Sequence, residues 1–371
     1  GAYDRRVIAV AVLFWASLAL LAWTHALYPL AAGLLARVRT RAVARDDSFL
    51  PSVAVIVTAY NEEASIERRL ENLRALDYPA DRVEVVVTSD ASSDRTEELA
   101  EAAGARVLRN PRGGKVAAQD AAVRATESEV VAFSDANATW APDALRRLVA
   151  NLADPEVAYV CGRLNITNED GRNKEGVYWR YELGTRAAES RLGSITGGNG
   201  SIYALRRADY VEVDPRFGHD LALPYLLVQR GRRVVYEPDA HAFEQATPTN
   251  EDEYRRKVRM FEHCWLIVLT GKMLRRQPPG YLVALLSHRH LRYASGLLHL
   301  VALGANLALL GGGALYAVTL GLQLGLLGAA LLGVGLPRYY VLVSWATVQA
   351  LFNYARRGVP ATWSPSREGV A

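Results

Sequence analysis

Hydrophobic residues are concentrated towards the two ends of the chain. Residues 7–36 form an apolar run without Asp, Glu, Lys or Arg. This run exceeds the ~20 residues that a helix needs to cross a bilayer, and it is longer than the apolar core of a cleavable signal peptide. Three further apolar stretches cover residues 295–313, 314–335 and 339–354. The pattern therefore predicts four membrane helices around a polar central region.

These stretches divide the chain into five expected units. They are an N-terminal membrane helix (1–36), a cytoplasmic domain (37–260), interfacial amphipathic helices (261–290), about three membrane helices (291–358) and a tail (359–371). The arginines that follow the first apolar run outnumber those that precede it: Arg37, Arg39, Arg41 and Arg45 against Arg5 and Arg6. Because positive residues stay on the cytoplasmic side, we expect a multi-pass protein of the bacterial inner (plasma) membrane. Arg356 and Arg357 weaken the case for the last crossing.

The central region alternates between buried-strand and helical patterns. The continuous apolar run at 53–58 predicts a buried parallel strand, and further strands are predicted at 83–88, 106–108 and 130–133. Helical spacing predicts helices at 62–76, 95–103 and 115–125, with Asp94 capping the second and Pro142 starting another. This alternation predicts an α/β fold with a mostly parallel, doubly wound sheet. Ligands of such sheets bind beyond the carboxyl ends of the strands.

Charge and cysteine content narrow the classes of function. The formal net charge is only +4 and no basic stripe is present, so we expect no nucleic-acid partner. Cys161 and Cys264 lie far apart without metal-site spacing, and we expect both to be reduced thiols. The first strand is not followed by GxGxxG, and the chain has no GxxxxGK(S/T) motif. A bound nucleotide must therefore be held by side chains and a metal ion.

Short motifs at the strand ends and beyond them carry a specific resemblance. In chain order they are VIVTAYNEE, VVVTSDASSDRT, GGKVAAQDAAVRAT, FSDAN, TGGNGSIYALRR, GHDLALPYLLVQRGRRVVYEP and RKVRM. Together they resemble the motifs of family 2 glycosyltransferases with the GT-A fold, in the membrane-integrated branch. That branch includes cellulose, hyaluronan and chitin synthases and ceramide glucosyltransferase. The resemblance covers roughly residues 52–265 and the flanking helices.

The resemblance implies inverting transfer of a sugar from a nucleotide-sugar, expected to be UDP-linked, to an acceptor hydroxyl. It places the general base at Asp220, a residue that also suits the N-cap of a helix. It places a divalent cation, Mg²⁺ or Mn²⁺, at Asp135. Asn137 stands where the family usually has a second aspartate, so we expect weaker metal binding, completed by a group such as His241.

The other site residues implied by the resemblance fall into two groups. Those expected to bind the nucleotide-sugar are Ala59, Tyr60, Glu62, Asp90, Lys115, Ser134, Asp135, Arg256 and Arg259. Those expected to contact the acceptor are Gly197, Gly198, Asn199, Gly200, His219, Met260 and Trp265. His219 replaces the usual glutamate before the base, and Met260 replaces a tryptophan that stacks on the acceptor sugar in processive synthases. Arg256 and Arg259 share a helical face that would equally suit lipid headgroups.

The nature of the acceptor stays open. The resemblance slightly favours a growing polysaccharide, whereas Met260 and the few expected helices favour a single transfer to a membrane lipid or a lipid-linked glycan. Asn137 and His219 also allow a non-catalytic membrane protein that binds nucleotide-sugars. A small-solute transporter is disfavoured because ionisable residues are scarce within the apolar runs. In each case we expect membrane lipids around the flanking helices.

Overall fold

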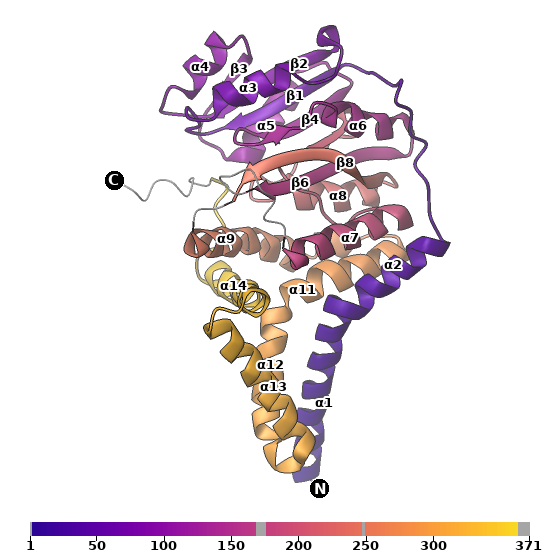
Figure 1. Ribbon diagram of the computed structural model, residues 1–371, viewed down its shortest axis with the longest axis vertical. Helices are drawn as coiled ribbons and strands as arrows, with labels where there is room; N and C mark the ends of the chain where they lie inside the picture. Colours follow the sequence, from indigo (N-terminus) through magenta and orange to yellow (C-terminus); the bar gives the residue numbers. More distant parts are fainter. Residues whose placement is uncertain (1, 168–175, 247–248, 363–371) are drawn as a thin grey trace.

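Figure 1 shows a domain built on a β-sheet above a stem of helices. The computed structural model describes residues 2–167, 176–246 and 249–362. The strands are β1 (Val53–Ala59), β2 (Val83–Asp90), β3 (Arg106–Asn110), β4 (Val130–Asp135), β5 (Thr139–Trp140), β6 (Val157–Thr167), β7 (Tyr203–Arg206) and β8 (Arg233–Gln245). The α-helices of the sheet domain are α3 (Ile66–Arg74), α4 (Thr96–Ala102), α5 (Lys115–Arg124), α6 (Ala144–Ala150), α7 (Val177–Leu192) and α8 (His219–Gln229).

The remaining helices belong to the stem and to the layer between stem and sheet. They are α1 (Ala2–Ala22), α2 (Tyr28–Val38), α9 (Asn250–Leu269), α10 (Pro279–Ala284), α11 (Leu291–Tyr293), α12 (Ser295–Ala308), α13 (Ala314–Leu331) and α14 (Gly335–Arg357). Two π-helical segments, η1 (Trp23–Leu27) and η6 (Leu285–His290), interrupt the helices near the base of the sheet domain.

One eight-stranded sheet has the strand order β3-β2-β1-β4-β7-β6-β8-β5. β1 pairs in parallel with β2 and β4, β2 with β3, and β6 with β8. β7 runs antiparallel to β4 and β6, and β5 runs antiparallel to β8. The predicted mostly parallel α/β sheet is therefore confirmed. β1–β4 are the four predicted strands, and β5–β8 are four further strands, of which β5 and β7 are antiparallel.

Alternate residues of β1 belong to two different hydrophobic clusters. Val55 and Val57 pack in one cluster with Ile66 of α3 and Leu145 of α6. Ile56 belongs to the other cluster, to which α5, α7 and α8 contribute. Both faces of the parallel strands are thus covered by helices. This burial places the polar side chains of the central strands at their carboxyl ends.

The helix predicted from residue 62 begins later, at Ile66. The backbone N–H of Glu62 donates to Thr96 Oγ1 at 2.8 Å, and Asn61 has a φ of 54°. The segment before Ile66 is therefore held as a turn beside the start of α4. The N-cap residue of α4 is Arg95 rather than Asp94. Asp94 still contributes to the start of the helix, because its Oδ1 accepts the backbone N–H of Thr96, the first residue of α4, at 3.0 Å.

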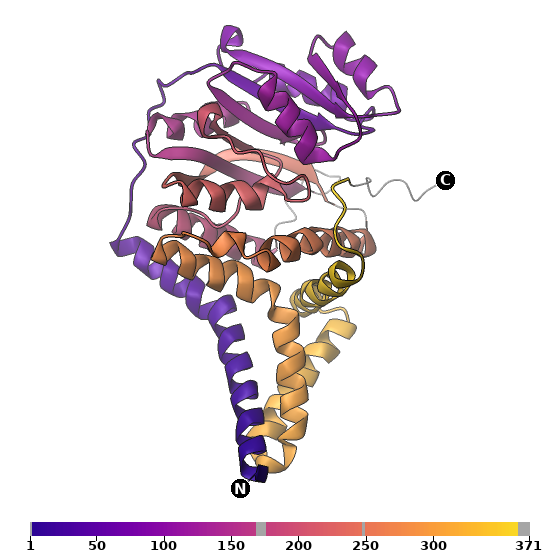
Figure 2. The ribbon, with the colours of Figure 1, turned by 180° about the vertical axis from the view of Figure 1, so that it is seen from behind.

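The stem contains α1, α12 and α13, which Figures 1 and 2 show side by side and pointing away from the sheet. Among the described residues, two helical stretches are long and apolar enough to cross a membrane by length and composition, Arg5–Val38 and Ala314–Leu331. Ser295–Ala308 is apolar but shorter. Two such helices agree with membrane association, and the prediction of four crossings stays a prediction.

The last helix, α14, does not extend along the stem. It lies against α9 beneath the sheet domain, as both views show. Trp265 of α9 donates its indole N–H to the carbonyl oxygen of Thr347 at 2.9 Å, and Asn353 donates to Glu262 Oε1 at 2.7 Å. α14 is therefore packed into the layer between stem and sheet.

The N-terminal helix is tied to this layer through polar contacts. Trp23 Nε1 donates to Ser287 Oγ at 2.8 Å, and Thr24 Oγ1 donates to the Ser287 carbonyl oxygen at 2.6 Å. Tyr28 donates its hydroxyl proton to Glu189 Oε1 of α7 at 2.9 Å. η1 and α2 thereby contact both η6 and α7.

A close contact between α12 and α14, at the base of the stem, predicts a stability effect. A Cβ atom added at Gly296 of α12 would lie 2.2 Å from the carbonyl oxygen of Ser344 in α14. Gly296→Ala should therefore push the two helices apart, at a cost of about 1–3 kcal/mol, and lower the melting temperature of the purified protein. Gly304→Ala in the same helix, which meets no atom within 4 Å, is the control and should not lower it. Equal melting temperatures for the two variants would contradict this packing.

Candidate active site

A cavity of about 1590 Å³ opens at the carboxyl ends of β1, β2 and β4 and extends to the base of the stem. The predicted site residues that line it are Ala59, Tyr60, Glu62, Asp90, Lys115, Asp135, Asn137, Gly197, Gly198, Asn199, Gly200, His219, Asp220, Arg256, Arg259 and Met260. Residues spread over two hundred positions of the sequence thus meet around one space. Ser134, His241 and Trp265 lie outside its lining.

One wall is formed by the loop that starts α5. Asp90, which is 2% exposed, accepts the backbone N–H groups of Gly113 and Gly114 at 2.7 and 3.0 Å. Gly114 has a φ of +91°, a conformation that favours glycine. Arg112 pairs with Asp90 Oδ2 at 2.5 Å and lies 3.3 Å above the ring of Tyr60. Asp90 therefore shapes this wall, and the Tyr60–Arg112 stack offers a flat cationic surface.

Asp135 and Lys115 form an ion pair at the centre of the cavity. Ser201 Oγ donates to Asp135 Oδ2 at 3.2 Å. A Cβ atom at Gly200 would lie 3.2 Å from Lys115 Nζ, so a glycine at this position leaves room for the lysine. Burial alone would lower the pKa of Lys115, but the adjacent Asp135 carboxylate raises it. Lys115, at the start of α5, thus places a positive charge against Asp135 at the end of β4.

Glu244 of β8 is a cavity residue that the sequence did not indicate. Burial and the charge of nearby Asp135 raise the pKa of Glu244 to about 6. Its Oε1 atom is buried and accepts no hydrogen bond among the described residues. An orphaned carboxylate oxygen close to a second carboxylate is the arrangement that a divalent cation satisfies.

His241, the expected additional metal ligand, is placed elsewhere. Its Nδ1 lies 3.1 Å from Asn165 Nδ2, and its ring stacks on Phe243. It is three positions from Glu244 on the same strand, so the two side chains point to opposite faces of the sheet. Glu244, rather than His241, shares the cavity with Asp135.

The described residues contain no group of three or more His, Cys, Asp or Glu side chains that could enclose a metal ion. Asp135 and Glu244 nevertheless fit a cation that takes its remaining oxygen ligands from a bound diphosphate and water. Asn137 also lines the cavity and adds a neutral amide oxygen.

Asp220 lies in the first turn of α8, near the positive end of the helix dipole. The N-cap of this helix is Gly218, so the alternative role of Asp220 as the N-cap is wrong. Its backbone carbonyl oxygen accepts the N–H of Gly198 at 2.7 Å, which joins α8 to the glycine loop. Within the described residues its half-buried side chain makes no hydrogen bond or ion pair, and it faces the cavity close enough to Lys115 to influence its pKa. This carboxylate is available to a ligand.

His219, expected beside the acceptor, has its ring engaged in the protein core. Its Nδ1 lies 3.2 Å from the hydroxyl of Tyr203 and its Nε2 lies 3.2 Å from that of Tyr210. Burial lowers the pKa of His219, although Asp120 nearby opposes the shift. These contacts anchor the start of α8 and so position Asp220.

Ser134 and Trp265 are packing residues in the structure. Ser134 is fully buried and donates to the carbonyl oxygen of Asp135 at 3.0 Å. Trp265 is 6% exposed and bonded to Thr347, so it is not presented to the cavity. Cys161 and Cys264 are buried and unpaired, as expected of reduced thiols.

On α9, Arg256, Arg259 and Met260 border the cavity. Arg256 pairs with Glu253 at 2.9 Å and lies close enough to Glu244 to lower its pKa. α9 therefore brings positive charge to the side of the cavity that holds Asp135 and Glu244.

Residues 54–213 match the family model described as "Glycosyl transferase family 2". The chain is 30% identical over 236 residues to an N-acetylglucosaminyltransferase of Rhizobium meliloti, covering 57% of this chain and 55% of that protein. It is 32% identical over 175 residues to a β-monoglucosyldiacylglycerol synthase of Synechocystis, covering 43% of this chain and 36% of that protein. The chain thus spans roughly a third to a half of the length of these relatives.

A solved structure shares the fold over nearly the whole chain. It is the mannosyltransferase PcManGT from Pyrobaculum calidifontis, in complex with GDP-Man and Mn²⁺. The TM-score is 0.75 at 24% sequence identity, and the match covers 94% of this chain and 98% of the other. The likeness extends beyond the sheet domain into the helices of the stem.

Proposed function

Because residues 54–213 match the family model of glycosyltransferase family 2, we propose that the protein is a membrane-associated enzyme that transfers a sugar, with inversion, from a nucleotide-sugar to an acceptor hydroxyl. The observation that supports this most directly is the Asp220 carboxylate. It faces the cavity without a protein partner among the described residues, near the Lys115–Asp135 pair. A base and a cationic diphosphate site are the two groups that such a transfer requires.

The donor side of the site binds the nucleoside diphosphate. Asp135 and Glu244 would hold a divalent cation, Mg²⁺ or Mn²⁺, which would supply positive charge to the diphosphate oxygens. Lys115 and Arg256 add fixed positive charge on the same side, so the leaving group departs towards cationic side chains. The Tyr60–Arg112 stack lies beside the loop at Asp90 and suits the nucleoside.

Asp220 acts on the acceptor. Its carboxylate takes the proton of the attacking hydroxyl as the acceptor oxygen bonds to the anomeric carbon and the bond from that carbon to the diphosphate breaks. Attack opposite the leaving group inverts the anomeric configuration. The glycine loop, joined to α8 by the Gly198–Asp220 hydrogen bond, holds the acceptor side of the cavity.

The position of the cavity favours a membrane-borne acceptor over a growing polysaccharide. The cavity extends to His25 of η1, Ser295 of α12 and Tyr340 of α14, which lie at the base of the stem. Met260 borders the cavity, while Trp265 is bonded within the protein and offers no surface for a sugar. We therefore favour a single transfer to a membrane lipid or lipid-linked glycan.

Purified full-length protein, UDP- and GDP-sugars and a membrane lipid extract provide the test. We expect hydrolysis of the donor or sugar transfer that depends on Mn²⁺. Transfer should increase the mass of the acceptor lipid by one sugar. A ladder of long products would favour polysaccharide synthesis instead. Binding of a nucleotide-sugar without any turnover would support a non-catalytic role. The same panel tests the predicted preference for UDP, since the similar mannosyltransferase was solved with GDP-Man.

Glu244 and His241 give a matched pair of variants for the metal site. Glu244→Gln keeps the shape but loses a charged ligand, and we expect the affinity for Mn²⁺ in the presence of UDP or GDP to fall about 10–100-fold. His241→Gln lies on the opposite face of β8 and should leave that affinity unchanged. Calorimetric titration of Mn²⁺ measures both, and the reverse ranking would restore His241 as the ligand.

A further inference from the structure

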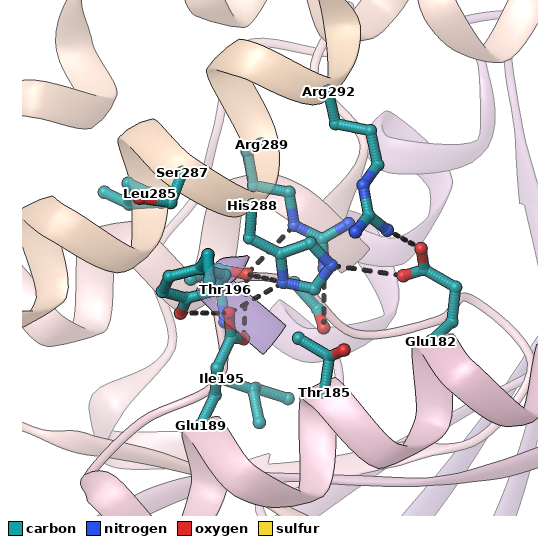
Figure 3. Close-up of polar contacts among 12 residues, drawn as sticks. Glu182, Thr185, Glu189, Ile195, Thr196, Leu285, Ser287, His288, Arg289 and Arg292 are labelled. Carbon is teal, nitrogen blue, oxygen red and sulfur yellow. Dashed lines mark hydrogen bonds and ion pairs between the residues drawn. The ribbon is translucent and has the colours of Figure 1, made fainter. Parts of the chain in front are cut away.

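Buried arginines lie at the end of the cavity nearest the stem, away from the proposed donor site. Arg186 of α7, Arg289 of η6 and Arg292 of α11 line this end. Figure 3 shows Arg289 and Arg292 reaching from one helical segment towards Thr196 and Glu182. The proposed transfer as described so far gives these charges no role.

Arg292 is compensated within the protein. It forms an ion pair with Glu182 and donates to the hydroxyl of Tyr181 at 2.9 Å. Its charge therefore needs no further partner.

The other carboxylate of this cluster, Glu189, is also fully used. It accepts from Tyr28 and from the backbone N–H of Thr196, and it lies 2.7 Å from Nδ1 of His288. Burial lowers the pKa of His288, although the adjacent Glu189 carboxylate opposes the shift. Glu182 is thus paired with Arg292. Burial would lower the pKa of Arg289, but Tyr293 and the Glu189 carboxylate raise it, so Glu189 partly balances Arg289. Among the described residues, no carboxylate forms an ion pair with Arg186.

Arg186 and Arg289 donate hydrogen bonds to oxygen atoms of residues 196–198, at the start of the glycine loop. Arg186 Nη2 donates to the Gly198 carbonyl oxygen at 3.2 Å, and Arg289 donates to Thr196 Oγ1 at 3.0 Å and to the Gly197 carbonyl oxygen at 3.4 Å. Arg186 is only 7% exposed, and its Nη1 is buried without a hydrogen-bond partner in the described part of the chain. Neither arginine makes an ion pair there. A buried guanidinium that, like Arg186, has an unmet N–H donor and no ion pair among the described residues is costly unless an anion in the cavity accepts from it.

These cations lie beside the proposed base. The pKa values of Cys264 and Tyr293 both respond to the charges of Arg289 and of Asp220, which places the two charges in the same part of the cavity. The loop that Arg186 and Arg289 hold is the one that bonds to Asp220 through Gly198. An anion bound here would therefore be fixed next to the hydroxyl that Asp220 deprotonates.

We propose that Arg186 and Arg289 form a phosphate subsite for the acceptor, and that the acceptor is a phosphate-bearing membrane lipid whose headgroup also carries the attacking hydroxyl. Guanidinium groups suit phosphate because their N–H donors match its oxygens in pairs. The cavity continues from this subsite to the base of the stem, which gives the lipid chains a path to the bilayer. This inference rests on the proposed sugar transfer and adds its acceptor class.

Matched lipids test the subsite without requiring turnover. Fluorescent phosphatidylglycerol and diacylglycerol with the same acyl chains carry hydroxyls, but only the first carries a phosphate. The full-length protein in detergent micelles should bind phosphatidylglycerol at least about tenfold more tightly, as expected for charge-assisted hydrogen bonds. Equal binding of the two lipids would overturn the proposal. If equimolar glycerol 3-phosphate displaced phosphatidylglycerol, the proposal that a lipid supplies the phosphate would be wrong.

Variants assign the effect to the two arginines. Arg186→Gln and Arg289→Gln should each lose the preference for phosphatidylglycerol, and Arg186→Lys should keep part of it. Arg191→Gln, an exposed change on α7, is the control and should bind as the unaltered protein does. Unchanged lipid preference in both glutamine variants, even with lowered melting temperatures, would show that the arginines only brace the glycine loop. Donor hydrolysis by the same samples reports on the proposed function separately.

Discussion

Replacing Asp220 by asparagine is expected to reduce sugar transfer by about 10²–10⁴-fold, the range associated with loss of a general base. Binding of the nucleotide-sugar should be preserved, because Asp220 makes no ion pair with the donor-side residues. Asparagine has the same shape and keeps the backbone bond to Gly198. The change is therefore confined to proton transfer.

Single-turnover rates and equilibrium binding of the donor separate the two effects of this variant. The control is Asp81→Asn, an exposed change in a short turn before β2. Loss of a charge near the start of α8 costs only about 0.3–1 kcal/mol of helix stabilisation, so the melting temperature should barely change. An Asp220→Asn enzyme with full turnover would exclude the residue as the base.

Replacing Asp135 by asparagine should abolish metal-dependent binding of the donor. Loss of an outer-shell partner of a metal site costs about 10–100-fold in affinity, and loss of a ligand itself should cost at least as much. The variant also leaves Lys115 without its ion-pair partner. The freed lysine is expected to bind the diphosphate directly, so weak, metal-independent binding should remain.

Titration of UDP and GDP with and without Mn²⁺ measures this change. Asp143→Asn is a suitable control, because Asp143 pairs with Arg147 at 2.6 Å and lies outside the cavity lining. If Mn²⁺ strengthened nucleotide binding equally in Asp135→Asn and in the unaltered protein, the cation would have to bind elsewhere.

Parts of the fold that depend on local pattern could be predicted from the sequence. β1 and β4 are apolar runs that are buried almost throughout, and helices separate β1 to β4 along the chain, so the pattern of these strands is clear. β7 has only four residues and pairs with β4 and β6, which lie tens of positions away in the sequence. No local signal specifies such a strand, and with it the antiparallel part of the sheet was missed.

The same distinction separates the site residues. Asp135 and Asp220 follow from motifs within single segments, and both line the cavity. The choice between His241 and Glu244 depends on which face of β8 meets Asp135. That face is set by pairing with β6, whose register shifts between Cys161 and Arg163. A register shift of one residue exchanges the two faces of a strand. The residues around the motif therefore could not show whether His241 or Glu244 faces Asp135.

Residues of the acceptor end were beyond the reach of sequence patterns for another reason. Arg289 lies in a stretch expected to be interfacial, where arginines commonly contact lipid headgroups. It meets the glycine loop only because η6 packs beneath α7 and the loop. Tertiary packing, rather than spacing along the chain, creates that contact.

The bonds from η1 and α2 to η6 and α7 make the catalytic domain hard to excise. A truncated protein that begins at β1 would lack the hydrogen bond from Tyr28 to Glu189 and the one from Thr24 to the Ser287 carbonyl oxygen. The Glu189 carboxylate and the π-helical turn at Ser287, which are buried in the intact chain, would then be exposed. The helices of the stem and the sheet domain are in this respect one folding unit. Truncated versions should be more prone to aggregate than the intact chain.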